Sequence, residues 1–128
     1  MPNRFEGTGN LGDEITVRNV VVKGDEQKVT TLRVFFDEYK SDGNGGYEQS
    51  GGFWMNVTVW GRRAEQAGNL LNKGSRVHVI GRLVEQQWKD KETGADRSGF
   101  IVEADELYLS LARVDSVTYK AKNNEENQ

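Results

Sequence analysis

The stretch GFWMNVTVWGRRAEQAGNLLNKG, residues 52–74, changes its hydrophobic period part-way along. Apolar and polar side chains alternate over residues 53–60, which is typical of a strand because successive side chains of a strand point to opposite faces. Farther on, Ala64, Ala67 and Leu71 recur at the spacing of one helical face, and the final glycine is typical of a helix stop. The stretch therefore predicts a strand followed directly by a short helix.

Two tryptophans of this strand fall on the side that carries polar residues. The predicted core face consists of Phe53, Met55, Val57 and Val59. Trp54 and Trp60 alternate with these residues and share the other face with Asn56 and Thr58. Both large rings are therefore expected to point away from the core.

Alternating and β-branched runs elsewhere predict further strands. The five expected strands cover residues 14–24, 28–39, 53–60, 75–88 and part of 100–111, with long polar loops over 40–52 and 89–99. Gly81, inside the fourth strand, predicts a bulge or a bend. This order is that of an OB-fold, which binds oligonucleotides and oligosaccharides. The expected fold class is thus all-β, a five-stranded OB-fold barrel with one short helix between strands 3 and 4.

The length of 128 residues is that of one domain with a modest core. We expect the OB-fold domain to span residues 1–111 and a short polar C-terminal extension, partly disordered, to span residues 112–128. No apolar run is long enough to cross a membrane, and the N-terminal residues contain no apolar signal core. A cytoplasmic location is therefore expected.

The residues that most enzymes and metal sites require are scarce in this sequence. The chain has no cysteine and a single histidine, His78, which lies in an expected strand and is interpreted as an ordinary sheet residue. GTGNLG (7–12) matches the GxGxxG pattern, but neither a preceding strand nor a following helix is expected, so it is interpreted as a tight loop leading into the barrel. We expect no catalytic residues, no metal and no cofactor.

The charge distribution favours a nucleic-acid partner more than the net charge does. The whole chain carries a formal charge of -3, yet residues 54–91 contain seven basic residues against three acidic ones. Three tryptophans, Trp54, Trp60 and Trp88, fall on polar faces or strand ends near these residues, and Tyr39 ends the second expected strand. Aromatic rings stack on bases and basic side chains contact phosphates, so together they favour single-stranded nucleic acid.

The chain resembles the bacterial single-stranded DNA-binding protein family from about residue 9 to residue 109. The similarity is carried by GNLG (9–12), VWGRRAE (59–65), LLNKGSRVHVIGRL (70–83) and QQWKDKETGADR (86–97). The resemblance implies that DNA winds over the OB-fold surface, with bases stacked on Trp54, Trp60, Trp88 and, more loosely, Tyr39. It implies phosphate contacts by Arg62 and Lys73, with further help from Arg33, Lys40 and Arg76.

The resemblance also implies a role in DNA replication, recombination or repair in the bacterial cytoplasm or nucleoid, and a homo-oligomer, either a tetramer or a dimer. The sequence departs from the family at RFEGT (4–8), where relatives have an apolar first strand that makes subunit contacts. Val84 and Glu85 replace residues that are commonly basic, which implies weaker or more salt-sensitive binding. The acidic C-terminal tip of the family has no counterpart, so tip-mediated recruitment of replication enzymes is not expected.

Two other functions remain open at the level of sequence. The exposed aromatics would equally suit an OB-fold protein-interaction module, such as a primosome-type accessory factor, in which they contact a protein. An OB-fold nuclease would require a metal-binding set of carboxylates, and the sequence places no such set. Binding of single-stranded DNA accounts for more of the pattern than either alternative.

Overall fold

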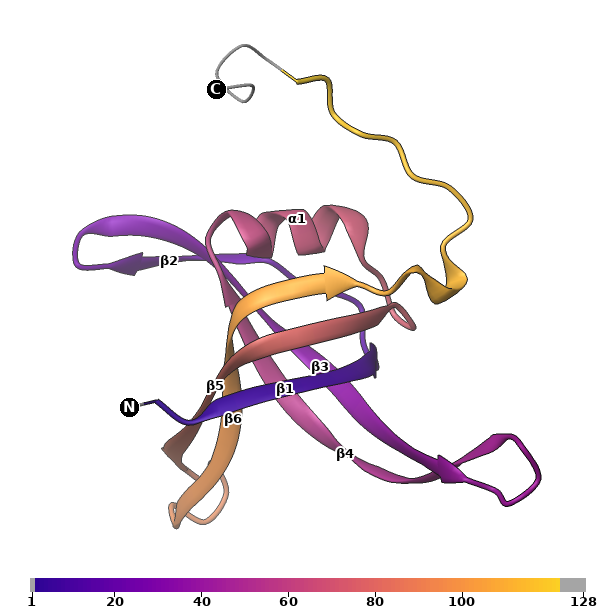
Figure 1. Ribbon diagram of the computed structural model, residues 1–128. Coiled ribbons are helices and arrows are strands. Elements are labelled where there is room, and N and C mark those ends of the chain that lie inside the picture. Colours follow the sequence, from indigo (N-terminus) through magenta and orange to yellow (C-terminus); the bar gives the residue numbers. More distant parts are fainter. Residues whose placement is uncertain (1, 123–128) are drawn as a thin grey trace.

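The computed structural model describes residues 2–122. Over these residues the chain forms six strands, one α-helix and one short 3-10 helix (Figure 1). The elements in chain order are β1 (Arg4–Leu11), β2 (Arg18–Val22), β3 (Asp25–Ser41), β4 (Tyr47–Trp60), α1 (Arg62–Leu70), β5 (Arg76–Lys89), β6 (Asp96–Leu109) and the 3-10 turn Leu111–Arg113.

Five of the strands close into a ring. The sheet order is β1-β5-β6-β4-β3-β2, and β1 also pairs with β3, so β1, β5, β6, β4 and β3 encircle the core. The helix lies between the third and fourth strands of this ring in chain order. The predicted five-stranded OB-fold barrel with one helix is therefore confirmed. β2 lies outside the ring as a short edge strand on β3.

The first member of the ring is not the strand expected from the sequence. The run 14–24 yields only the edge strand β2, whereas GTGNLG lies mostly in β1 and is not a tight loop. The glycines of this motif permit the strand. A Cβ on Gly9 would lie 2.2 Å from the carbonyl oxygen of Phe35, so only glycine lets β1 approach β3 and close the ring.

The core is made by the inward residues of the alternating strands. Its buried members include Leu32, Val34, Val57, Val59, Val77, Val79 and Val102. The predicted bulge is confirmed, because the register of β5 with β6 shifts between Ile80 and Gly81. Phe53 is on the core side as predicted, yet 39% of it is exposed because it lies in a cluster of rings with Phe5 and Phe36 rather than in the sealed core.

The two expected loops are mostly long hairpins that extend from the barrel (Figure 1). β3 and β4 pair until Ser41 and Tyr47, and β5 and β6 pair until Lys89 and Asp96. Hydropathy could not reveal these extensions. Strands that project beyond the core bury neither face, so apolar and polar residues do not alternate along them. The prediction of loops over residues 40–52 and 89–99 is therefore wrong except at the hairpin tips.

The helix is shorter than predicted. Ala64 and Ala67 are buried against the barrel as their spacing indicated, but α1 ends at Leu70. Gly74 is not its stop: it lies in the turn before β5 with φ 93° and donates its N–H to the carbonyl of Leu11 (2.8 Å). That bond ties the turn to β1.

Candidate nucleic-acid interface

The face of β4 that carries the tryptophans points outward as predicted. Val57 and Val59 are 0% and 1% exposed, whereas Trp54 and Trp60 are 48% and 40% exposed. The outward residues of β4 and of its neighbours β3, β6 and β5 form one surface, here called the stacking face. Its members are Thr31, Arg33, Phe35, Trp54, Asn56, Thr58, Trp60, Arg82, Val84, Gln86, Trp88, Arg97, Gly99, Ile101 and Glu103.

Trp54 is surrounded by residues from two elements. Phe35 lies directly opposite it on β3, and the two ring centroids are 5.2 Å apart. The guanidinium carbon of Arg33 lies 5.3 Å from the Trp54 ring centroid, within the range of a cation–π contact. Arg33 also donates a hydrogen bond from Nη1 to Oδ1 of Asn56 (3.2 Å). Arg33 is thus held over the indole, and Phe35 is an outward ring that was not among the predicted site residues.

Trp60 lies where the sheet meets the helix. It lines a shallow groove of about 350 Å³ with Arg62, Arg63 and Gln66 of α1. Arg63 pairs with Glu106 at 3.2 Å, whereas Arg62 forms no ion pair with any residue between 2 and 122. Beside the exposed Trp60 ring, the positive charge without an acidic partner is therefore that of Arg62. This supports Arg62, and not Arg63, as the predicted phosphate contact.

A second groove runs across the stacking face and connects its strands. It has a volume of about 340 Å³. Its lining comprises Arg18, Val29, Thr31, Asn56, Thr58, Trp60, Gln86, Ile101 and Glu103. Side chains with hydrogen-bonding groups thus lie between the aromatic rings, on strands that are far apart in sequence. Such an arrangement can hold the edges of bases whose faces are stacked.

Trp88 lies farther along the same face, on the hairpin of β5 and β6. It is 49% exposed and is paired with Arg97 across the hairpin. Lys89 contacts Asp96 at 2.6 Å, and Arg97 contacts Asp90 at 3.4 Å. The ring is accessible, but the basic residues beside it already have acidic partners.

Tyr39, Lys73 and Arg76 gather at a different place. They line a groove of about 670 Å³, here called the end groove, with Asn10, Arg113 and neighbouring residues of the α1–β5 turn and the end of β6. Tyr39 is 54% exposed there. Lys40 lies nearby in the chain, on the β3–β4 hairpin, and contacts Glu48 at 3.9 Å. The predicted site residues therefore divide between the stacking face with its adjoining helix and this second region.

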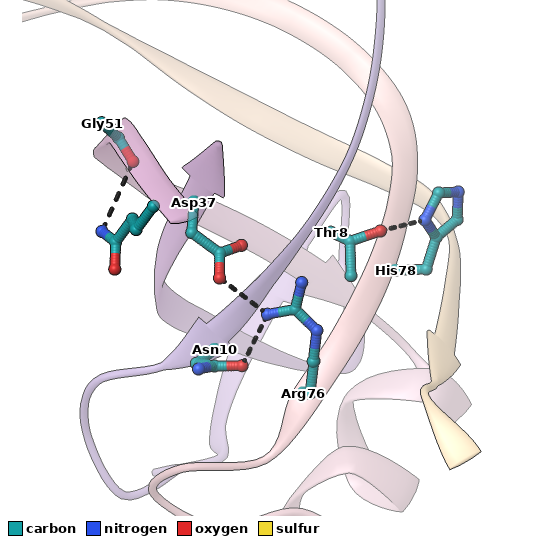
Figure 2. A network of polar contacts seen from close by, with 7 residues as sticks. Thr8, Asn10, Asp37, Gly51, Arg76 and His78 are labelled. Atoms are coloured by element: carbon teal, nitrogen blue, oxygen red, sulfur yellow. Dashed lines mark hydrogen bonds and ion pairs between the residues drawn. The ribbon is translucent and has the colours of Figure 1, made fainter. Parts of the chain in front are cut away.

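Arg76 differs from the other predicted cations because its side chain is only 29% exposed and its guanidinium is bonded to a buried carboxylate. Its Nη1 donates to Oδ2 of Asp37 (3.0 Å) and to Oδ1 of Asn10 (3.1 Å), as Figure 2 shows. The Asp37 side chain is only 6% exposed. Burial acts to raise the pKa of Asp37, but the hydrogen bond and the charge of Arg76 outweigh it and hold that pKa below its usual value.

His78 is a sheet residue with two polar neighbours. Its Nδ1 lies 2.7 Å from Oγ1 of Thr8, and its Nε2 lies 2.8 Å from Oε2 of Glu6. The hydrogen bond from His78 lowers the pKa of Glu6, and the charges of His78 and Arg4 add to the effect. Between residues 2 and 122, no group of three or more His, Cys, Asp or Glu side chains could hold a metal ion. No helix in this part of the chain has the length and apolar character needed to cross a membrane.

Known proteins share both the sequence pattern and the barrel. The model of the family described as the Single-strand binding protein family matches residues 2–110. The chain belongs to this family. The family assignment covers every strand of the barrel and all the predicted site residues.

Similar proteins include two cyanobacterial family members. The chain is 37% identical over 62 residues to Single-stranded DNA-binding protein 1 of a Nostoc strain, an alignment that covers 48% of this chain and 52% of the relative. It is 33% identical over 63 residues to Single-stranded DNA-binding protein 1 of Synechocystis, which covers 49% and 52%. The chain thus matches about half the length of these relatives.

A solved structure shares the fold over most of the chain. It is the small single-stranded DNA-binding protein of Streptomyces coelicolor, with a TM-score of 0.71 and 19% sequence identity. The superposition covers 89% of this chain and 99% of the other. At this identity the likeness shows the barrel architecture.

Proposed function

We propose that this protein binds and coats single-stranded DNA with little sequence preference. Bases stack on Trp54, Trp60 and Trp88 of the stacking face and on Tyr39 of the end groove. Phosphates are contacted by Arg33, Arg62, Lys73, Lys40 and Arg76. We further propose that the DNA-binding domain spans residues 1–111, with a C-terminal extension over 112–128. The prediction that this extension is partly disordered includes residues 123–128, which lie outside the described residues.

The observation that carries this proposal is the outward position of three tryptophans on one barrel face. Each is between 40% and 49% exposed, so each ring offers a surface that the protein core does not use. Stacking of a base on such a ring contributes about 1–3 kcal/mol and tolerates any base, because every base has a π-face. The family assignment supports the same function.

We infer the cellular setting from the family. We propose that the protein acts without catalysing a reaction, in DNA replication, recombination or repair, in the bacterial cytoplasm or nucleoid. We also propose a homo-oligomer, a dimer or a tetramer. Sedimentation of the free protein tests this part: a species of one chain mass at micromolar concentration contradicts it.

Titration with oligo(dT), followed by tryptophan emission, tests DNA binding. Saturating oligo(dT) at low salt should quench the emission, because stacked bases contact the indoles. If all five basic residues contact phosphates, the logarithm of the binding constant should fall with the logarithm of salt concentration with a slope of about -3.5 per chain.

The same titration separates DNA binding from the protein-interaction alternative. A partner-docking module would keep its emission unchanged on addition of DNA, and its emission would instead respond to protein concentration as the chains assemble. Unchanged emission at saturating DNA and low salt contradicts the proposed function.

A further inference from the structure

A glycine lies under the outer ring edge of two of the proposed stacking tryptophans. A Cβ on Gly12 would lie 2.5 Å from Cζ3 and 2.6 Å from Cη2 of Trp54. A Cβ on Gly99 would lie 3.2 Å from Cη2 and 3.5 Å from Cζ3 of Trp88. Non-bonded carbon atoms prefer separations of about 3.5–4 Å. The distal edge of Trp54 therefore occupies the space that a methyl group on Gly12 would fill, and the distal edge of Trp88 leaves such a group on Gly99 only a tight fit.

The backbone does not require glycine at either position. Neither Gly12 nor Gly99 is among the glycines with positive φ, so an alanine could adopt the same backbone conformation. Gly52 differs: it lies under the Phe35 ring in the same way, but its φ is 145° and a Cβ would meet a carbonyl oxygen of β3 at 2.6 Å. At Gly12 and Gly99, the contact with the ring is what an added methyl group would change.

The two glycines come from separate parts of the chain. Gly12 follows β1, and its N–H donates to the carbonyl of Arg33 (2.8 Å), which fixes it beside β3. Gly99 is in β6 and is paired with Gln86 of β5, two residues before Trp88. In both cases a hydrogen-bonded backbone fixes the glycine: Gly99 lies beside Trp88 of the neighbouring strand β5, and Gly12 lies beside β3, across which the Trp54 ring of β4 reaches it.

We propose that Gly12 and Gly99 are positioning residues for DNA binding: each seats the distal edge of an indole on the backbone and holds the ring ready to stack on a base. This rests on the proposed function. A ring that is already ordered loses less conformational freedom on binding, which favours affinity. An indole displaced by a methyl group presents its face at another angle and must be reordered by the ligand.

Alanine substitution at each glycine tests the proposal in the full chain. Affinity is measured by the anisotropy of a labelled oligo(dT), because this signal does not depend on tryptophan emission. Gly12→Ala should weaken binding about tenfold, since Trp54 must move by about 1 Å to relieve the contact. Gly99→Ala should weaken binding about threefold, because its contact is looser and needs a shift of only a few tenths of an ångström.

Double variants identify the ring through which each glycine acts. In a Trp54→Ala background, Gly12→Ala should cause no further loss of affinity, and the same holds for Gly99→Ala in a Trp88→Ala background. The crossed pair Gly99→Ala with Trp54→Ala should show independent losses, and it is the matched control. Gly→Ala at a compatible backbone position tends to raise stability, so the melting temperature of the single variants should not fall.

The outcomes separate the proposal from the function on which it rests. If wild type binds oligo(dT) and Trp54→Ala weakens binding, but Gly12→Ala binds like wild type, the positioning proposal is overturned and the function stands. The proposal is likewise overturned if a Gly→Ala substitution lowers affinity equally in the wild-type background and in the background that lacks the tryptophan, because the glycine would then act through another group. Absence of binding by wild type overturns both.

Discussion

The exposed tryptophans are the residues whose substitution separates binding from folding. Trp54 and Trp88 are about half-exposed and lie outside the core cluster. We predict that Trp54→Ala and Trp88→Ala each weaken oligo(dT) binding about tenfold, because each removes one stacking surface. Thermal unfolding of both variants should stay close to that of wild type, and anisotropy titration should show the loss of affinity.

A buried residue of the same strand provides the contrast. Val57 is 0% exposed and lies between the two tryptophans of β4 in sequence. Val57→Ala should lower the free energy of unfolding by about 2 kcal/mol, with DNA affinity retained in the fraction that remains folded. If Trp54→Ala and Trp88→Ala instead lose as much stability as Val57→Ala, the rings serve packing and not DNA.

At the scale of elements, three strands meet at one ion pair where the barrel closes. Arg76 of β5 is hydrogen-bonded to Asp37 of β3 and to Asn10 of β1 (Figure 2). The other carboxylate oxygen of Asp37 is buried and has no hydrogen-bond partner among residues 2–122. The pair therefore holds a carboxylate that would be costly to leave unpaired.

We predict that the Asp37–Arg76 pair makes the free energy of unfolding decrease at acid pH. The pKa of Asp37 is lower in the folded protein than its usual 3.8, so its contribution to stability is present above about pH 4 and is lost as the pH falls through the folded pKa. Asp37→Asn should remove this part of the pH dependence. Denaturant unfolding of both proteins between pH 2 and 7 measures the difference.

Removal of the guanidinium tests the same pair from its other side. Arg76→Ala should lower the free energy of unfolding at pH 7 by about 2 kcal/mol, because it leaves a buried carboxylate unpaired. Asp37→Asn in the Arg76→Ala background should restore part of that loss. An Arg76→Ala variant with unchanged stability and weakened DNA binding contradicts the structural role and makes Arg76 chiefly a phosphate contact.

Local periodicity explains which elements could be predicted from the sequence. The outward tryptophans of β4 and the buried alanines of α1 followed from periods of two and about 3.6, because each element packs one face on the core. Periodicity did not predict β1, because its glycines serve a close approach of two strands that only the closed barrel creates; only the family resemblance placed a first strand at residues 4–8. Phe35 had a usable signal: in the adjacent pair Phe35–Phe36, alternation requires that one ring faces outward.

The ion pair and the division of the site had no signal in the sequence. Asp37 and Arg76 are 39 residues apart and meet only through the ring closure. Tyr39 and Lys73 belonged with the tryptophans in the sequence interpretation, but they line the end groove instead of the stacking face. Only the pairing of strands in the folded barrel brings such residues together. The local pattern of the sequence does not reveal that pairing.

At the scale of the whole molecule, the two regions suggest that DNA follows a path longer than one groove. The stacking face spans β3, β4, β6 and β5, and the end groove lies by the α1–β5 turn. A single OB-fold covers about 4–16 nucleotides. If the proposed site residues bind DNA, a short oligonucleotide occupies the aromatic surface alone, and we expect a longer one to reach both regions.

This path predicts that the effect of a substitution depends on oligonucleotide length. Lys73→Ala should weaken binding of an oligo(dT) of about 16 nucleotides and leave that of about 4 nucleotides unchanged, while Trp54→Ala should weaken both. Lys23→Ala is the matched control, because Lys23 lies in the β2–β3 turn and lines none of the grooves described above. Anisotropy titrations at one fixed salt concentration provide the comparison. Equal losses for both lengths on Lys73→Ala would place Lys73 beside the first bound nucleotides and contradict a path that begins on the stacking face and extends into the end groove.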